Sequence, residues 1–441
     1  MNSNRSRRFF AFVSIALFFA AQLSAQDSLT IDRAIDIVIK RNFSIRQGEE
    51  ALAAAKEHTG GLKSANYPNV NAVISDTYIG PRYPFSFGAE KLNMVPDNAF
   101  DAHIGADFTV YDFGKRQKTI ETGAIAENTA ADRLAGIKTE LTYQVRQLFT
   151  SIILQEKSLR VADEGIAELD QHLDVVKKKI ETGSATEYDI LKTEVQQATA
   201  KSMRIDIAND LKKKNSTLCL LLGFAPDVVV SCFGPIDTLQ VRGNADSLFR
   251  AAIANRSDYA LLLHAKQSAE LELGRTKLEN RPIVGLHASA GFKNGLPNDK
   301  MPPDINTPRV NWAAGATITA PLYDGKRAEQ RKKESQRLCD AAQAGIVDKE
   351  EHIRIEIQQA MADVDASFSK LDVSRAQVRF AQRSLELARF KYEAGVITNL
   401  DVLDAENDFS QAKLSHLQNQ FRYVISVYGL DQATGVALNK K

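Results

Sequence analysis

The chain has 441 residues, with 56 Lys and Arg against 55 Asp and Glu and a formal net charge of +1. This balance gives no reason to expect nucleic acid as a partner, because nucleic-acid binding needs a marked excess of basic residues. The three cysteines and seven histidines lack metal-site spacing, and no phosphate-binding loop or nucleophile elbow is present, so neither an enzyme nor a cofactor is predicted.

The first 25 residues have the pattern of a secretory signal peptide. Three arginines precede an apolar run from Phe9 to Ala20, and small residues follow up to Ala25. This run is short for a membrane span of about 20 residues, so we expect cleavage after Ala25 rather than a membrane anchor. No cysteine lies near that site, so a lipid anchor is not indicated. The mature protein is expected outside the cytoplasm.

A helical stretch over about residues 29–64 opens the mature chain, and Pro68 ends it. Apolar and polar residues then alternate, which predicts strands over about residues 69–79 and 99–112 with one apolar face and one polar face. Each alternation is about as long as the 9–11 residues that a tilted strand needs to cross a bilayer. A soluble sandwich sheet remains the alternative reading of the strands alone.

A long helix is expected over residues 115–182, which contain no proline. Its apolar residues recur at gaps of three, four and seven, a stripe typical of coiled coils. At 1.5 Å per residue the helix is roughly 100 Å long, so it must bridge a distance. A second helix over residues 187–222 is expected to return antiparallel to it.

The segment GSATEYDILKTE lies between these two helices. Gly183 leaves the first helix with positive φ at low cost, and Thr186 is a suitable cap for the next. Asp189 follows in the first turn, where the helix dipole favours negative charge. The segment therefore predicts a tight turn at the end of the rod that lies opposite the strands.

The same plan recurs in the second half. GVITNLDVLDAE begins at Gly395, 212 residues after Gly183, and the turn motif Phe113–Arg116 matches Asp324–Arg327 at an offset of 211. This order and spacing indicate a tandem duplication, with repeats over 26–223 and 244–441 joined by a connection over 224–243. The second repeat is expected to contain a helix over 244–280, strands over 282–292 and 310–323, a long helix over 326–394 and a return helix over 399–433.

Four strands cannot close a barrel, and lipid tolerates no open sheet edge. If the strands cross a membrane, several chains must pool them, and two, three or four copies all reach the minimum of about eight strands. The alternative is a periplasmic structural coiled coil without a pore, which accounts for the helices and not for the strands. Cys219 lies in an apolar helical run and is expected in the core, and its pairing with Cys232 is left open.

The chain resembles the TolC-like outer-membrane efflux proteins over essentially the whole mature sequence. No single motif is decisive, but their order, spacing and duplication are specific together. The segments that carry the resemblance are Leu29–Ala34, Tyr111–Arg116, Ala320–Arg327, Lys391–Gly395 and Asp401–Glu406.

The resemblance implies a mainly α fold with membrane β-strands. Three chains would pool four strands each into a 12-stranded β-barrel, and their long antiparallel coiled-coil helices would form an α-barrel. Such a homotrimer is a channel in the outer membrane with a periplasmic helical domain. It would export small molecules or proteins, as in efflux or type I secretion, together with a periplasmic adaptor (membrane fusion) protein and an inner-membrane transporter. The connection over 224–243 would belong to an equatorial region.

The resemblance also implies roles for individual residues. Asp401 and Asp404 would ring the periplasmic mouth as a selectivity constriction, although Lys192 stands at the place of Asp404 in the first repeat. Tyr392 would act in gating with Asp189, but the family's gating arginine falls at Ile397 in this chain. The residues implied in docking the adaptor are Gly183, Thr186, Leu191, Gly395, Thr398 and Leu403.

Overall fold

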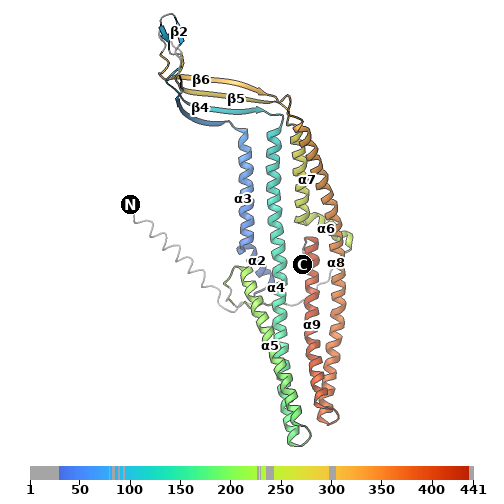
Figure 1. Ribbon diagram of the computed structural model, residues 1–441. Coiled ribbons are helices and arrows are strands. Elements are labelled where there is room, and N and C mark those ends of the chain that lie inside the picture. Colours follow the sequence, from blue (N-terminus) through green and yellow to red (C-terminus); the bar gives the residue numbers. More distant parts are fainter. Residues whose placement is uncertain are drawn as a thin grey trace, which may run out of the picture. The chain divides into compact units, whose positions relative to one another are not determined.

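The computed structural model describes residues 29–78, 80–81, 85–87, 90–92, 95–225, 228, 230–234, 243–296 and 304–436 (Figure 1). The signal peptide expected over residues 1–25 and part of the connection over residues 224–243 lie outside the described residues. The chain divides into two compact units, and each contains segments from both repeats. Unit 1 comprises Met1–Gln47, Ala135–Ser257 and Glu350–Lys441, and unit 2 comprises Gly48–Leu134 and Asp258–Lys349.

Unit 2 contains a four-stranded antiparallel sheet in the order β1-β4-β5-β6. β4 from the first repeat pairs with β5 from the second, with Ala106 opposite Ala288, so the two repeats share one sheet. A short hairpin of β2 and β3 forms within the segment between β1 and β4. The strands are β1 Asn69–Tyr78, β2 Phe85–Phe87, β3 Glu90–Leu92, β4 Asn98–Tyr111, β5 Ile283–Lys293 and β6 Arg309–Thr319.

The four-stranded sheet exposes apolar side chains in the chain that the structure describes. β1 is exposed along its whole length, and Ile74 on β1 and Trp312 on β6 are among its most exposed large side chains. β1 and β6 are the two edges, and each has one partner strand among the described residues. The sheet therefore combines exposed apolar side chains with two edges that have no second partner strand among the described residues.

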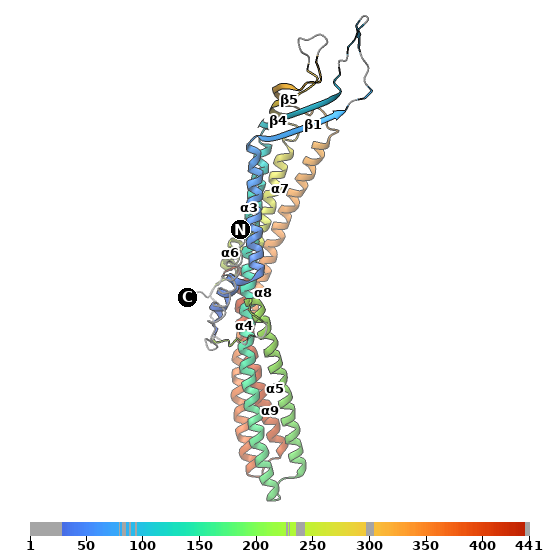
Figure 2. The same cartoon turned by 90° about the vertical axis from the view of Figure 1, so that its left-hand side faces the viewer.

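Each half of the sheet continues into a helix of 67 residues, α4 Lys115–Glu181 or α8 Arg327–Glu393. At 1.5 Å per residue each is about 100 Å long. The return helices, α5 Glu187–Leu222 and α9 Asn399–Thr434, run antiparallel beside them (Figure 2). Within the described part of the chain, no helix is both long enough and apolar enough to cross a membrane.

The largest fully buried side chains of unit 1 lie on α2, α4, α5, α8 and α9, together with Ile45 at the start of α3. In the same unit the chain before α2 is tied to the connection between the repeats, because Leu29 N donates to Ser231 O at 2.9 Å. The buried set includes Val38, Val145, Phe149, Ile152, Leu218, Leu222, Ile353, Ile357, Leu371 and Leu430.

Cys219 and Cys232 are both buried in unit 1, and neither takes part in a disulfide. The pairing that the sequence left open is therefore not formed in this structure. The Cys219 thiol donates to the carbonyl of Val228 at 3.1 Å. Burial, followed by the nearby Glu156 and Cys219, raises the pKa of Cys232 to about 12, so its thiol stays protonated.

The helices expected as single stretches over residues 29–64 and 244–280 are each interrupted, at Asn42 and at Arg256. The interruptions separate α2 Ile31–Arg41 from α3 Phe43–Lys63, and α6 Ala245–Asn255 from α7 Ser257–Thr276.

Both interrupting side chains bind the end of a return helix. Asn42 Nδ2 donates to Leu221 O at 3.1 Å, and Arg256 Nη1 donates to Ala433 O at 3.0 Å. Leu221 and Ala433 are the penultimate residues of α5 and α9, whose last carbonyls have no partner within the helix. The breaks therefore serve tertiary hydrogen bonds, which local helical patterning does not reveal.

The repeats keep one offset along their long helices. Lys115 and Arg327, the first residues of α4 and α8, are 212 positions apart (327 − 115 = 212), and α5 and α9 start with the same offset. The strand-to-helix turns agree with it: Asp112 Oδ2 accepts from the N–H of Arg116 at 2.7 Å, and Asp324 Oδ2 from that of Ala328 at 2.9 Å. The Gly-Lys-Arg motifs, which are 211 positions apart in the sequence, are therefore displaced by one residue from the structural offset of 212.

Candidate functional site at the two helical turns

The turns after α4 and α8 have the same backbone geometry. Gly183 and Gly395 adopt φ values of 73° and 75°, a region that other residues enter at a cost. Ser184 N donates to Lys179 O at 2.7 Å, and Val396 N donates to Lys391 O at 2.9 Å, so each helix ends in a Schellman motif. Both turns lie in unit 1.

A capping box starts each return helix. Thr186 N and Thr398 N each donate at 2.8 Å to Oδ2 of an aspartate three residues later, Asp189 or Asp401. The threonine hydroxyls bind the same carboxylate oxygens, at 2.8 Å and 2.6 Å. The Thr398 hydroxyl and backbone N–H lower the pKa of Asp401. Asp401 is therefore a charged, exposed carboxylate that already caps its own helix.

Asp404 lies one turn further along α9 and is exposed. Within the described residues it makes no hydrogen bond or ion pair. At the equivalent place on α5, Lys192 is also exposed, with Nζ 5.5 Å from the ring centroid of Tyr188. The two turns thus share their backbone and caps but present opposite charges at this position.

Tyr392 is buried at the centre of a small apolar cluster. Its partners in the core are Val176 of α4 and Val402 of α9, and Ile397 packs against the same cluster. Its ring lies 5.4 Å from that of His172, and Lys179 Nζ lies 4.8 Å from its centroid. Ile397 therefore contributes apolar packing at the position where the resemblance implied an arginine.

The Tyr392 hydroxyl has no hydrogen-bond partner among the described residues. Burial, followed by the charge of Asp189, raises the pKa of Tyr392. The resemblance implied that Tyr392 and Asp189 act together in gating. The structure brings them close enough to interact electrostatically, without a hydrogen bond between their side chains in the described chain.

Asn399, the first residue of α9, is a functional candidate that the sequence reasoning missed. Its Oδ1 lies 2.7 Å from His172 Nε2 of α4, and its Nδ2 donates to Asp189 O at 3.1 Å and Thr193 Oγ1 at 3.2 Å on α5. Because an amide oxygen only accepts, His172 must donate from Nε2. Burial lowers the pKa of His172, which favours a neutral ring. The only sequence signal was a change from Glu187, the equivalent first residue of α5.

A second missed cluster lies about two helical turns from Asn399. Arg389 Nη2 of α8 donates to Glu168 Oε2 of α4 at 2.9 Å and to Glu406 Oε1 of α9 at 3.1 Å. Glu406 Oε2 has no hydrogen-bond partner among the described residues. Burial raises the pKa of Glu406 to about 7, against the opposing hydrogen bond from Arg389. Its position directly after the apolar residues Val402, Leu403 and Ala405 was the available sequence signal.

Exposure divides the residues that the resemblance implied in docking. Gly183, Thr186, Gly395 and Thr398 are exposed. Leu191 is 53% exposed, whereas its equivalent Leu403 is only 5% exposed. The side chain of Leu403 is therefore buried within the chain, and the docking role expected for it from the sequence stays a prediction.

The sequence profile described as "Outer membrane efflux protein" matches residues 34–224 and 248–436. The chain is 24% identical over 293 residues to the outer membrane efflux protein BepC of Brucella suis, a match that covers 66% of this chain and 60% of BepC. It is 22% identical over 404 residues to the cobalt-zinc-cadmium resistance protein CzcC of Cupriavidus metallidurans, covering 89% of this chain and 87% of CzcC.

Solved structures share this fold at low sequence identity. A crystal structure of CusC aligns with a TM-score of 0.79 and 16% identity, covering 94% of this chain and 96% of CusC. The outer membrane protein VceC of Vibrio cholerae aligns with a TM-score of 0.76 and 15% identity, covering 93% of this chain and 97% of VceC.

Proposed function

The chain belongs to the outer membrane efflux protein family, and from this premise we propose that three copies form the exit channel of an envelope-spanning export complex. Members of this family are outer-membrane channels and not enzymes, with their helices in the periplasm. The proposal adds the number of copies, the partners and the cargo class. The export partners would be a periplasmic adaptor protein and an inner-membrane transporter, and the cargo would be small molecules or proteins.

The observation that carries the assembly is the pair of open edges on the four-stranded sheet. β1 and β6 each lack a second partner strand in the described chain, and lipid provides no hydrogen bonds to unpaired backbone groups. Pairing β6 of one copy with β1 of the next removes both edges, and three copies supply twelve strands. The alternative, a periplasmic structural coiled coil without a pore, gives this sheet no role.

The helices of unit 1 offer matching support. Val373, Phe380 and Leu387 of α8 are exposed and seven residues apart, the spacing of a coiled-coil seam. Tyr188, Leu191 and Val195 form an exposed apolar row on α5. We infer that these two rows are covered by neighbouring copies, which extends the helical hairpins into a ring.

In this ring the acidic turn of the second repeat is the proposed periplasmic mouth. Three copies of Asp404, with Asp401 beside it, would concentrate negative charge and favour cations. Tyr392 and the Asn399 contacts would hold the two hairpins of each copy together and so keep the mouth narrow. The exposed turn residues, Gly183 and Gly395 among them, are the proposed contact with the adaptor.

The names of similar proteins cover several cargoes. CusC of Escherichia coli is a cation efflux protein, AprF of Pseudomonas aeruginosa is an alkaline protease secretion protein and OpmQ is a pyoverdine export protein. All are 20–23% identical to this chain. The cargo is therefore proposed only as a class, and the inner-membrane partner is expected to select it.

Cross-linking between sheet edges tests the assembly. In a background with Cys339→Ser, full-length protein carrying Ala72→Cys on β1 and Ala314→Cys on β6 is treated in outer membranes with a short bifunctional thiol reagent. We expect a ladder that stops at three chains, whereas either single variant stays monomeric, because the proposed ring places identical strands of neighbouring copies four strands apart. Conductance of the purified protein in planar bilayers tests the pore. A monomer without conductance would overturn the proposal.

A further inference from the structure

The turn from β6 into α8 carries exposed residues that the proposed channel does not use. Leu322 is 97% exposed and Tyr323 is 84% exposed. Residues 326–334 follow with five cations and two carboxylates, and all of the charged side chains there are exposed. These segments lie in unit 2, directly after the sheet. An apolar pair beside a dense cationic run is unusual on a water-facing surface.

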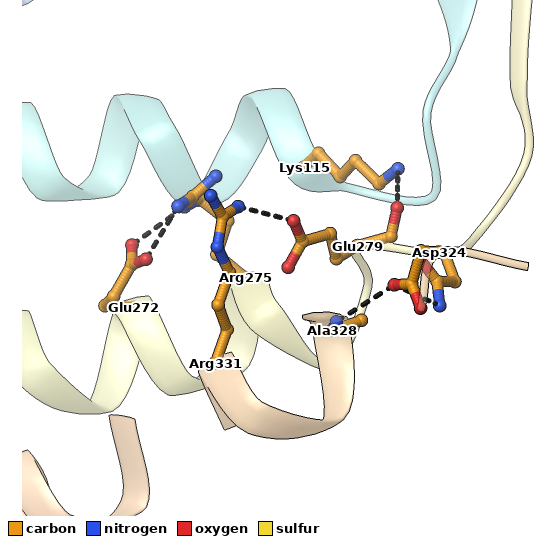
Figure 3. Close-up of polar contacts among 8 residues, drawn as sticks. Lys115, Glu272, Arg275, Glu279, Asp324, Ala328 and Arg331 are labelled. Atoms are coloured by element: carbon orange, nitrogen blue, oxygen red, sulfur yellow. Dashed lines mark hydrogen bonds and ion pairs between the residues drawn. The ribbon is translucent and has the colours of Figure 1, made fainter. Parts of the chain in front are cut away.

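Two of the five cations are engaged within the chain. Arg331 Nη1 pairs with Glu279 Oε1 at 2.5 Å, and Lys333 Nζ pairs with Glu329 Oε1 at 2.6 Å (Figure 3 draws the Arg331 pair). The other three, Lys326, Arg327 and Lys332, make no side-chain hydrogen bond or ion pair in the part of the chain that the structure describes. Their charge is therefore available to an external anion.

The first repeat uses its equivalent cations differently. Lys115 Nζ donates to the carbonyls of Glu279 and Arg281 at 2.9 Å and 3.0 Å (Figure 3). Arg116 Nη1 donates to the carbonyls of Ala65 and Thr109, both at 2.9 Å. Both side chains are half-buried and hold the turn together. These contacts leave neither cation available to a ligand.

The one-residue displacement of Gly-Lys-Arg releases the cations of the second repeat. At the structural offset of 212, Ala328 is equivalent to Arg116, and its methyl side chain has no donor that could bind carbonyls. Lys326 adopts a φ of 68° in the turn itself. Asp324 accepts from Ala328 N and Asn280 Nδ2, so it occupies the start of α8 (Figure 3). Any anion here must therefore bind the side chains rather than the helix end.

We propose that Leu322, Tyr323, Lys326, Arg327 and Lys332 bind the headgroup of an anionic phospholipid at the periplasmic surface of the outer membrane. The apolar pair enters the leaflet and the cations bind the phosphate, as expected for tyrosine and basic residues at a membrane boundary. β6 leads into this turn and presents the exposed Val310, Trp312 and Ile318 on one of its faces. The inference rests on the outer-membrane location and not on the cargo or the adaptor.

A tryptophan reporter tests the proposal in the full-length protein. Trp312 is the only tryptophan, so Trp312→Phe with Tyr323→Trp leaves one fluorophore in the site. The protein is reconstituted in vesicles of phosphatidylethanolamine with brominated phosphatidylglycerol, or with brominated phosphatidylethanolamine instead. Bromine quenches nearby tryptophan, and we expect stronger quenching by the anionic lipid.

A charge-matched comparison isolates the three cations. In the reporter background, Lys326→Gln, Arg327→Gln and Lys332→Gln together should lower the preference for phosphatidylglycerol on the order of a hundred-fold. The control, Arg337→Gln, Arg375→Gln and Arg383→Gln, removes three exposed cations further along α8 and should leave the preference unchanged. Inorganic phosphate at millimolar concentration should not reverse the quenching, whereas reversal would assign the site to free phosphate and overturn the lipid proposal.

Two results would refute the site directly. Equal quenching by both lipids would remove the headgroup assignment, and no quenching by either would show that a neighbouring copy covers these residues. If the reporter variant does not assemble, native mass spectrometry of protein with Trp312 intact replaces it. The retained phosphatidylglycerol should then fall in the triple glutamine variant and not in the control. If the cross-link between β1 and β6 fails, the proposed trimer is contradicted. The lipid preference measured here does not depend on that result.

Discussion

The side-chain amide of Asn399 donates a hydrogen bond of 3.1 Å to the backbone carbonyl of Asp189, which ties the start of α9 to the start of α5. The same side chain also contacts His172 and Thr193. One buried residue therefore connects both hairpins at the proposed mouth of the channel, and it is a natural position for the first test.

Asn399→Ala removes all of these contacts and leaves the buried His172 donor without its partner. We expect the free energy of unfolding to fall by about 1–3 kcal/mol, because an unsatisfied buried polar group costs roughly that much. Loosening the hairpins should also raise bilayer conductance. The exposed neighbour offers a control, since Leu400→Ala should change neither. Unaltered stability in Asn399→Ala would show that the contacts are not formed in the assembled protein.

The buried carboxylate of Glu406 should make stability depend on pH. Its pKa is raised from 4.5 to about 7 in the folded chain, so the folded state holds a proton that the unfolded state releases. The contribution of Glu406 to the free energy of unfolding is then fully present below about pH 4.5, and it is lost as the pH rises through about 7. We expect a decrease on the order of 3 kcal/mol across that window in urea denaturation, and Glu406→Gln should abolish it.

The equivalent residue in the first repeat is the control for this pH effect. Glu194 stands 212 positions before Glu406 and is exposed. Glu194→Gln should therefore leave the slope of stability against pH as it is in the unmodified protein. A slope that survives in Glu406→Gln would assign the proton to another group.

Two substitutions should distinguish the contributions of the hydroxyl and the ring of Tyr392 to the free energy of unfolding. Because the hydroxyl lacks a partner among the described residues, Tyr392→Phe is expected to leave the free energy of unfolding unchanged or to raise it by about 1 kcal/mol. Tyr392→Ala should lower it by about 3–5 kcal/mol through the cavity it leaves. A large loss in Tyr392→Phe would mean that the assembled channel supplies a partner for the hydroxyl, as a gating role requires.

The turn glycines should respond to alanine differently from a glycine within a helix. Gly395→Ala forces a side chain into a φ of 75° and should lower stability by about 1 kcal/mol. Gly345 lies inside α8 with nothing within 4 Å of an added Cβ, so Gly345→Ala should raise stability by about 0.5–1 kcal/mol. If thermal denaturation shows that Gly395→Ala lowers stability and Gly345→Ala raises it, the positive φ of Gly395 is supported. Equal changes in the two variants would contradict it.

Ion selectivity should depend more on Asp404 than on Asp401. Asp401 shares its charge with the helix cap, whereas Asp404 has no partner in the described chain. We expect Asp404→Asn to reduce the cation-to-anion permeability ratio roughly several-fold in bilayers, and Asp401→Asn to reduce it less. Asp408→Asn removes an exposed charge one turn further along α9 and is the control. If all three variants behave alike, the constriction lies elsewhere.

Local sequence patterns were sufficient to predict the strands and helices in which a regular pattern continues over many residues. The alternation in Phe100–Tyr111 and the apolar stripe of residues 115–182 are properties of short windows, so the strands and long helices were predictable. The turn at Gly395 was equally predictable, because a glycine, a threonine cap and an early aspartate act within one segment.

Contacts between distant segments were not predictable in this way. Asn42 and Arg256 interrupt helices in order to bind carbonyls about 180 residues away in sequence, and nothing in their neighbours indicates this. Leu403 was expected to dock a partner and Glu406 was given no role, because the burial of both side chains depends on other helices. The position of Ile397 suggested a missing charge, whereas the structure places it in an apolar cluster.

The constant offset of 212 along α4 and α8 means that both helices have the same number of residues, so the length of each is constrained. Between the start of the sheet and the start of the long helices, the offset changes from 214 to 212, because β1 and β5 begin 214 positions apart. An inserted residue in a hairpin loop is absorbed locally, but one inserted in α8 rotates every later side chain by about 100°. Epitope tags should therefore be inserted between β5 and β6. An insertion in either long helix would shift the register of all the contacts that follow it.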